Sequence, residues 1–387
     1  MISYGKQSIE QSDIDAVIGV MQSDMLTQGA YVEIFEKDLK NYFGSMNACA
    51  VANGTAALHL TAMALGWKHG DIILTSPLTF LATANCIVYV GATPDFVDID
   101  PTTFTIDPNL LEEKIKMYLS LGNKVKAVIG VDYAGHPCDW KALRDIANRY
   151  DLQLVNDNCH ALGASYFGDK CYAANYADVV TQSYHPVKHI TTGEGGAILT
   201  NDSSIDEKVR SLRSHGMVRQ VDNLKNTDRP WYYEMHEVGY NYRITDFQCA
   251  LGSNQLKRLD QFIDKRRRIA QKYDELFINS VFTVPKSSSS IAHAYHLYPL
   301  QIDFNKLKLS KTDFFNKIKK VGISLQVHYI PVYLQPFYEK EFSFKAGYCR
   351  KAEIFYNQTF SIPIYPSLKD NEVEKVGFEV NKLIEIK

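Results

Sequence analysis

Residues 125–131 read Val-Lys-Ala-Val-Ile-Gly-Val, a run in which only Lys126 carries a charge. Apolar residues occupy neighbouring positions in it, instead of alternating with polar ones, and most of them are β-branched. This pattern is typical of a strand that is buried on both faces. Strands of that kind form mainly parallel sheets that helices cover on both sides. The stretch therefore predicts an α/β fold.

Similar short apolar runs lie on both sides of this stretch. They occupy residues 71–75, 94–98, 152–155 and 196–200, each bounded by Gly, Pro or Asp. Helical patterns separate several of them, including 55–67 and 139–150. In a parallel sheet with helical crossovers, ligands bind beyond the carboxyl ends of the strands. We therefore expect the functional residues just after these runs.

The chain changes character after about residue 244. An amphipathic helix is predicted from Ile244 to Leu276, with a break near Leu259, and a Ser-rich loop follows at 287–290. The remaining patterns are one strand and two helices, at 298–302, 311–321 and 370–386. This mixture is typical of a smaller α+β domain. We predict two units: an N-terminal segment with a large ligand-binding domain (1–250), and a linking helix with a small C-terminal domain (251–387).

The composition is that of an ordinary globular protein. The 387 residues are 45% hydrophobic and 22% charged, with a net charge of −2. A balanced charge gives no indication of a nucleic-acid or membrane partner. The start of the chain lacks the apolar core of a signal peptide, and no run is long enough to span a membrane. Seven scattered cysteines without a CxxC pair favour reduced thiols over disulfides or a metal site, and hence a cytoplasmic protein.

Two residues after predicted strands are candidates for chemistry. Asp157 follows the run at 152–155, where a carboxylate can keep the ring nitrogen of pyridoxal phosphate (PLP) protonated. Lys188 lies between a strand end and the Gly-rich turn at 193–196, where a partly desolvated lysine can act as a nucleophile and proton carrier. Taken singly, an aspartate at such a place more often caps a turn, and a lysine in a loop is more often an ordinary surface charge.

Two further features suit the same ligand. Asn53, Gly54 and Thr55 begin a predicted helix, whose free N–H groups and dipole can bind a phosphate. Phe80 follows the strand at 71–75, where an aromatic ring can stack on a flat heteroaromatic one. Helix capping and core packing are the alternative roles of these residues.

The order of these motifs along the chain resembles the order found in the sugar aminotransferases of the DegT/DnrJ/EryC1/StrS family. The likeness runs almost from end to end. Besides the motifs above, it is carried by Tyr4–Ile9, Ser23–Gly29, Gly239–Asp246 and Ser361–Pro366. The resemblance implies the type I PLP aminotransferase fold, with a large domain around a mainly parallel sheet and a smaller α+β domain.

The resemblance also implies a role for each cofactor residue. The lysine matching Lys188 holds PLP as a Schiff base and is the catalytic residue, and the aspartate matching Asp157 pairs with the ring nitrogen. The remaining cofactor positions stack on the ring, lie beside it or bind the phosphate: Phe80, His160, Gly54, Thr55 and Ser183. Asn241 matches an asparagine that reaches the cofactor site of the neighbouring subunit, which implies a homodimer with shared sites.

Within the family, the closest likeness is to the transaminases of pseudaminic acid biosynthesis. By that likeness, L-glutamate donates its amino group to C4 of a UDP-linked 2-acetamido-2,6-dideoxy-4-hexulose. Tyr4, Asp24, Met25, Leu26, Thr27, His328, Tyr329, Ile330 and Pro331 are then expected to line the sugar pocket. His189 departs from that subgroup, which usually has proline beside the lysine.

Three alternatives remain at the level of sequence. The first is amination at C4 or C3 of another nucleotide sugar, of the bacillosamine or perosamine type. The second is PLP-dependent sugar deoxygenation, against which Lys188 argues because such family members carry histidine there. The third is a non-catalytic, PLP-binding regulator.

Overall fold

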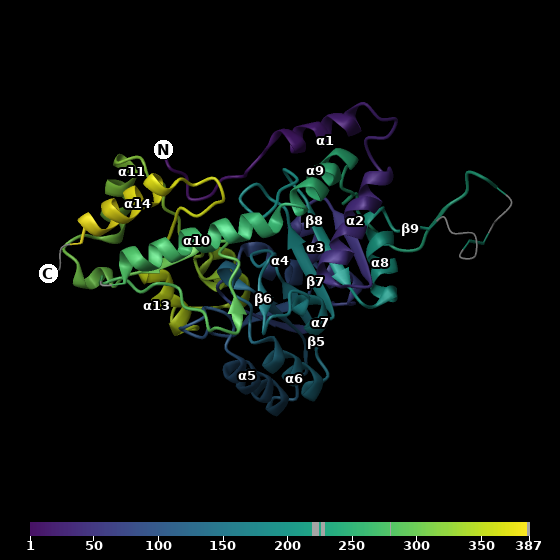
Figure 1. The fold of residues 1–387 in the computed structure, drawn as a ribbon. Helices are drawn as coiled ribbons and strands as arrows, with labels where there is room; N and C mark the ends of the chain where they lie inside the picture. Colours follow the sequence, from purple (N-terminus) through teal and green to yellow (C-terminus); the bar gives the residue numbers. More distant parts are fainter. Residues whose placement is uncertain (219–223, 226–228, 279, 385–387) are drawn as a thin grey trace.

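In the computed structural model, which describes residues 1–218, 224–225, 229–278 and 280–384, a seven-stranded sheet forms the centre of the molecule (Figure 1). Its order is β1-β8-β7-β5-β4-β2-β3. The strands are β1 (Asn47–Val51), β2 (Ile72–Thr75), β3 (Thr93–Phe96), β4 (Val125–Val131), β5 (Gln153–Asp157), β7 (Val179–Ser183) and β8 (Gly196–Thr200). All pairs from β3 to β7 are parallel, and β8 runs antiparallel to both of its neighbours, β7 and β1. The predicted mainly parallel sheet is confirmed.

Both faces of this sheet are buried, as the apolar runs predicted. Val128, Leu154 and Leu199 point into one core, whereas Ile129, Val155 and Ile198 point into the other. The first core is covered by α2 (Ala30–Phe43), α5 (Pro108–Ser120), α6 (Trp140–Tyr150), α7 (Tyr172–Tyr176) and α9 (Asp246–Leu256). The second is covered by α3 (Gly54–Ala64), α4 (Leu81–Tyr89) and α8 (Ser203–Arg213).

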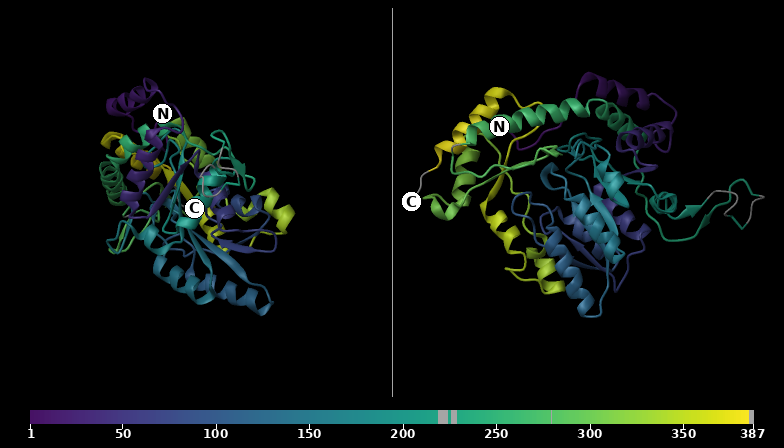
Figure 2. Two further views of the ribbon diagram at one scale, coloured as in Figure 1. Left: turned by 90° about the vertical axis from the view of Figure 1, so that its right-hand side faces the viewer. Right: turned by 60° about the horizontal axis from the view of Figure 1, so that its bottom comes forward.

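The predicted long helix is two helices, α9 and α10 (Leu259–Phe277), separated at Lys257 and Arg258. Figure 2 shows α10 running from the sheet region toward the C-terminal part of the chain. There it packs in a separate core with α11 (Lys311–Lys320), α14 (Asp370–Lys382) and the antiparallel pair β12 (Tyr298–Gln301) and β13 (Thr359–Ile362). Ile2 belongs to this core as well. The domain boundary at residue 250 stays a prediction.

The remaining helices and short strands lie outside the central sheet. They are α1 (Gln11–Met21), α12 (Pro336–Phe342), α13 (Arg350–Gln358) and the short strands β6 (Ser165–Tyr166), β9 (Met217–Val218), β10 (Glu234–Met235) and β11 (Ile291–Ala292). The β9 segment lies at the side of the body (Figures 1 and 2). The predicted helix 370–386 is α14, and residues 385–387 lie outside the described part.

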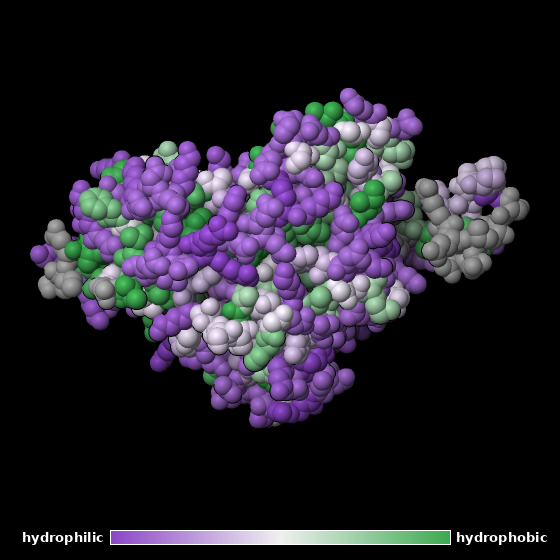
Figure 3. Space-filling view, viewed as in Figure 1, coloured by the Kyte–Doolittle hydropathy of each residue, from purple (hydrophilic) through white to green (hydrophobic). Residues whose placement is uncertain are grey.

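The surface is mostly hydrophilic on the face shown in Figure 3, with small scattered hydrophobic patches. Within the described ranges, none of the helices is both long and apolar enough to cross a membrane. All seven cysteines are free thiols, and five of them are buried.

Candidate active site

A pocket of about 650 Å³ opens at the carboxyl edge of the sheet. Asp157 is the last residue of β5, Ser183 is the last residue of β7, and Asn53 follows the end of β1. Pairing of Asp157 with Thr181 and of Ser183 with Gly196 brings these strand ends to the same edge. The pocket therefore lies where a parallel sheet is expected to bind its ligand.

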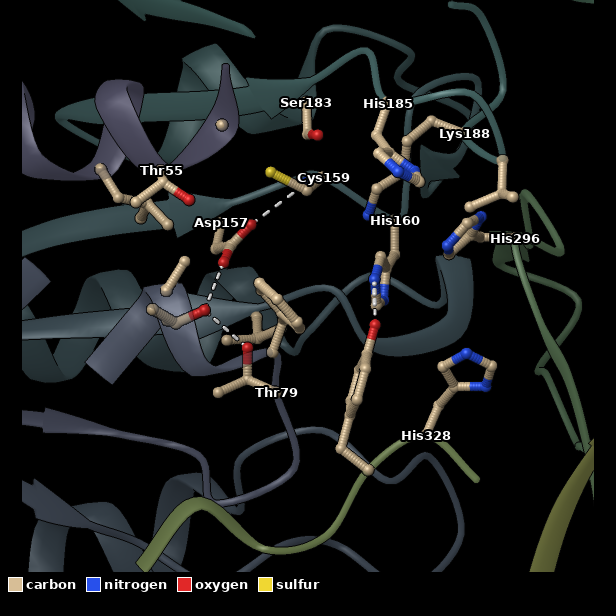
Figure 4. Close-up of a pocket in the computed structure, with 18 of the residues that line it drawn as sticks. Thr55, Thr79, Asp157, Cys159, His160, Ser183, His185, Lys188, His296 and His328 are labelled. Carbon is tan, nitrogen blue, oxygen red and sulfur yellow. Dashed lines mark hydrogen bonds between the residues drawn. The ribbon is translucent and has the colours of Figure 1, made fainter. Parts of the chain in front are cut away.

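Asp157 is held by a chain of buried hydroxyl groups. The Thr83 hydroxyl donates a hydrogen bond to Asp157 Oδ2 at 2.6 Å, and it accepts one from Thr79 at 2.6 Å (Figure 4). The Cys159 N–H donates to Asp157 Oδ1 at 3.3 Å. Asp157 is only 6% exposed, and its immediate hydrogen-bond partners are neutral. A buried carboxylate whose hydrogen-bond partners are neutral suits a site whose ligand brings a positive charge.

The start of α3 forms a close backbone cradle beside Ser183. Asn53 caps the helix by accepting from the Ala56 N–H at 2.8 Å. A methyl group on Gly54 would lie 2.8 Å from the Ser183 Cβ, so only glycine lets these two segments approach so closely. The first N–H groups of a helix have no partner within it. The backbone of Gly54 and Thr55 and the Ser183 hydroxyl thus offer donors at a helix N-terminus, a place that suits an anion.

Lys188 lies on the opposite side of the pocket from Asp157 (Figure 4). Its loop starts with a turn in which the Lys188 N–H donates to the His185 carbonyl at 2.9 Å. Pro186 occupies the second position of that turn, where its fixed φ angle is favourable. Burial lowers the pKa of the Lys188 amine, and the nearby Cys159 and Asp157 counteract part of that decrease. A lysine with a lowered pKa is more often the free, nucleophilic amine.

Imidazole and phenol groups close the pocket. The His160 Nε2 and the Tyr329 hydroxyl are 3.1 Å apart and share a hydrogen bond. His328 packs against Tyr4, with their ring centroids 5.3 Å apart, and the His328 Nδ1 is 2.9 Å from the Ser361 hydroxyl. Phe80 is 56% exposed and its ring is 6.1 Å from that of Tyr329. An exposed aromatic face at this place is available to a ligand.

Residues 7–381 match the model of a known family, the DegT/DnrJ/EryC1/StrS aminotransferase family. The chain belongs to this family. It is 39% identical over 381 residues to the UDP-4-amino-4,6-dideoxy-N-acetyl-beta-L-altrosamine transaminase of Campylobacter jejuni (strain 81-176), a match that covers 97% of this chain and 96% of the relative.

Two solved structures resemble this aminotransferase over nearly its whole length. Helicobacter pylori PseC, an aminotransferase involved in the biosynthesis of pseudoaminic acid, has a TM-score of 0.90 at 31% identity and covers 99% of both chains. The PLP form of the putative sugar aminotransferase Spr1654 from Streptococcus pneumoniae has a TM-score of 0.87 at 26% identity, covering 98% of this chain and 97% of that one. The predicted family, fold class and enzyme class, a PLP-dependent aminotransferase, are confirmed.

The pocket of the aminotransferase brings together most of the residues predicted to form it. Its lining includes all the predicted cofactor residues except Asn241, together with three of the predicted sugar-pocket residues: Gly54, Thr55, Phe80, Asp157, His160, Ser183, Lys188, Tyr4, His328 and Tyr329. What each of these residues binds stays a prediction.

Seven of the predicted residues lie elsewhere. Asp24, Met25, Leu26 and Thr27 are exposed between α1 and α2, and Asn241 precedes α9. Ile330 and Pro331 follow Tyr329 but are absent from the lining of the pocket. Thr27 pairs with Thr245, and the Asp246 N–H donates to the Leu26 carbonyl at 2.9 Å, so the segment 24–27 contacts the start of α9.

The sequence did not single out several other residues of the pocket. Thr83 is one of them. It lies in the first turn of α4, four residues after Thr79, and this spacing of two hydroxyl groups was a signal that could have found it. Glu194, His296 and Val327 offered none, because they come from a loop and from segments far along the chain.

Proposed function

We propose that this aminotransferase transfers an amino group from L-glutamate to C4 of a UDP-linked 2-acetamido-2,6-dideoxy-4-hexulose. The product is a UDP-4-amino sugar for pseudaminic acid and surface glycan biosynthesis. The observation that carries the proposal is the meeting of Lys188, Asp157 and the α3 N-terminus in one pocket. The choice of sugar is supported by the Campylobacter jejuni relative, whose name specifies a UDP-4-amino-4,6-dideoxy sugar.

We infer that the pocket holds PLP, because its donor groups fit each part of that molecule. The Lys188 amine suits the aldehyde, the Asp157 carboxylate suits the protonated ring nitrogen, and the N–H groups of Gly54 and Thr55 with the Ser183 hydroxyl suit the phosphate. Phe80 and His160 offer ring faces to the cofactor. When bound, PLP supplies an electron sink that makes the α-proton of an amino acid removable.

Lys188 has two tasks in the proposed reaction. Its amine would hold the cofactor covalently, and its Nζ, when free, would accept the proton from the glutamate Cα. In the second half of the reaction, Nζ returns a proton to C4 of the sugar. Attachment to the cofactor and acceptance of the proton both need a neutral amine, and burial favours it by lowering the pKa of Lys188.

The sugar is expected to bind at the side of the pocket formed by Tyr4, His328 and Tyr329. Burial raises the pKa of Tyr4 and lowers the pKa of His328 to about 3, so both side chains stay uncharged and act as hydrogen-bonding groups near neutral pH. Uncharged donors and acceptors suit the hydroxyl and acetamido groups of a sugar. The reduced thiols are compatible with action in the cytoplasm.

The working enzyme is proposed to be a homodimer with shared sites. Asp24 to Thr27 and Asn241 are exposed and lie outside the pocket of their own chain, as expected of residues that serve a neighbouring subunit. The segment after β9 exposes large apolar side chains, including Trp231 (77%) and Val238 (70%). Such side chains are commonly covered by a partner.

The test is to incubate the PLP-loaded protein with L-glutamate and a panel of UDP- and dTDP-linked 4-keto and 3-keto sugars. Products are identified by mass and NMR, with Lys188→Ala as the control. We expect amination of the UDP-linked N-acetyl 4-keto sugar and none with the control. Amination of other sugars only would replace the proposed substrate, and conversion of PLP by glutamate without any sugar product would leave only the first half-reaction.

A further inference from the structure

His189, the residue that follows Lys188, is a buried part of the structure and not a surface histidine. It is 3% exposed, and its Nε2 lies 3.2 Å from the Ala294 carbonyl oxygen. A carbonyl oxygen only accepts hydrogen bonds, so Nε2 must carry the hydrogen. The other ring nitrogen, Nδ1, is buried and has no partner. The ring is therefore a neutral donor that ties the Lys188 loop to Ala294.

The segment that receives this hydrogen bond is itself fixed. The Ala294 N–H donates to the Gly135 carbonyl at 2.9 Å, and α10 caps the neighbouring carbonyl groups through Arg266 and Arg267. The capped carbonyls are those of Ala292, His293, Tyr295 and His296. With the bond from His189, every carbonyl from 292 to 296 has a donor. Ala294 is thus a rigid anchor for the lysine loop.

On its other side, the His189 ring packs against residues that line the pocket. Its ring centroid is 5.5 Å from that of His296, which in turn is 4.4 Å from that of His160. His160 then bonds to Tyr329. A continuous row of rings therefore connects the residue beside Lys188 with the group expected to face the cofactor, and His296 contributes to the pocket wall (Figure 4).

The surroundings favour a neutral His189. Burial lowers its pKa well below the usual histidine value, and the cationic groups of Arg266, Lys188 and Arg267 lower it further. His160 and His296 are buried in the same way, with pKa values also well below the usual one. In the described part of the chain, no set of three His, Cys, Asp or Glu side chains is arranged to hold a metal ion. The row of imidazoles thus acts through hydrogen bonds and packing.

We propose that His189 is a positioning residue for Lys188: its hydrogen bond to Ala294 holds the lysine loop in place, and its ring supports His296 and His160. The inference rests on the proposed role of Lys188 as the PLP-bearing residue. Loss of the bond lets the loop move away from the anchor, so that the Lys188 amine becomes more hydrated and less well directed at the cofactor.

Two amide variants separate this role from simple packing. In His189→Gln the amide nitrogen reaches about as far as Nε2, whereas in His189→Asn it reaches only about as far as Nδ1 and leaves Ala294 without its donor. We would measure the attachment of PLP to the apo protein as a function of pH, by absorbance and by the dissociation constant, together with thermal unfolding. Neither measurement needs the sugar.

We expect His189→Asn to bind PLP about two- to tenfold more weakly, the range that one hydrogen bond allows. The pH midpoint for PLP attachment should move upward, toward the ordinary lysine value, because a hydrated amine is protonated more readily. His189→Gln should restore both properties. If the Asn variant does not fold, His189→Leu, which fills the space without a donor, replaces it.

A pH midpoint and a PLP affinity like those of the wild type in the Asn or Leu variant would overturn the proposal. The proposal would also be overturned if the Gln and Asn variants lost the same amount of PLP affinity and that loss matched the decrease in their unfolding temperatures. Such a result would indicate that His189 acts through packing alone. Failure of the wild type to aminate any sugar while it still binds PLP through Lys188 would concern the proposed substrate and leave this inference intact.

Discussion

Substitution of Gly54 by alanine tests the phosphate cradle most specifically. The added methyl group would lie 2.8 Å from Ser183 Cβ and 3.2 Å from its Oγ. Overpacking of this kind costs about 1–3 kcal/mol. Alanine regains about 0.5–1 kcal/mol, because glycine loses more backbone entropy on folding. We therefore expect the free energy of unfolding to fall by a net amount of about 0.5–2 kcal/mol, measured by urea unfolding of the apo protein.

A double-mutant cycle with Ser183→Gly tests the same contact, because that substitution removes the side-chain atoms that the new methyl group would meet. In Gly54→Ala with Ser183→Gly, the nearest remaining atom is the Gln182 carbonyl oxygen at 3.5 Å, an ordinary contact. The two substitutions should then couple by about 0.5–2 kcal/mol in the stabilising direction.

Affinity for PLP should respond differently from stability. Gly54→Ala should weaken PLP binding roughly tenfold or more, the equivalent of about 1.4 kcal/mol. The double variant should stay weak, because it also lacks the Ser183 hydroxyl. PLP binding by Gly54→Ala with the affinity of the wild type would refute a phosphate site at the start of α3, and absence of coupling would refute the close contact.

Other predictions concern Asp157 and acid stability. Thr83→Val removes the hydroxyl that donates to Asp157 Oδ2 at 2.6 Å. We expect the half-reaction with glutamate, followed by stopped-flow absorbance, to slow about ten- to a hundredfold. The control Thr83→Ser should react at nearly the wild-type rate, and an unchanged rate in Thr83→Val would contradict the role of this hydrogen bond. Stability should fall in acid, because the folded pKa of His328 is about 3 against about 6.5 in the unfolded chain. Below pH 6.5 the unfolded state binds the additional proton, which costs about 1.4 kcal/mol per pH unit for each such histidine. Urea midpoints from pH 7.5 to 5 should decrease, less steeply in His328→Asn, and a pH-independent midpoint would be inconsistent with a neutral buried ring.

The fold was predictable where burial leaves a local pattern. The strands at 125–131 and 196–200 have the predicted bounds, because every position in them except Lys126 is apolar or small. β1, Asn47–Val51, was not predicted, although it is buried beside β8. Its composition of small residues, Asn-Ala-Cys-Ala-Val, lacks the β-branched run that identifies the other strands.

The site was predictable where chemistry follows a strand end. Asp157 and Ser183 end β5 and β7, so their place at the rim follows from sheet topology alone. His296 comes to the pocket through long-range packing against His160, which no local pattern records. Conversely, Asp24 to Thr27 were expected at the pocket from family likeness, but the single chain places them on its surface. A site shared between subunits cannot be completed by the topology of one chain.

The lysine that binds PLP can be identified directly. The protein is loaded with PLP and reduced with borohydride, and its peptides are mapped by mass spectrometry, with Lys188→Ala treated in parallel. We expect the added mass on Lys188 in the wild type and no added mass in the variant. A label on another lysine, or an equal label in the variant, would show that Lys188 does not bind PLP.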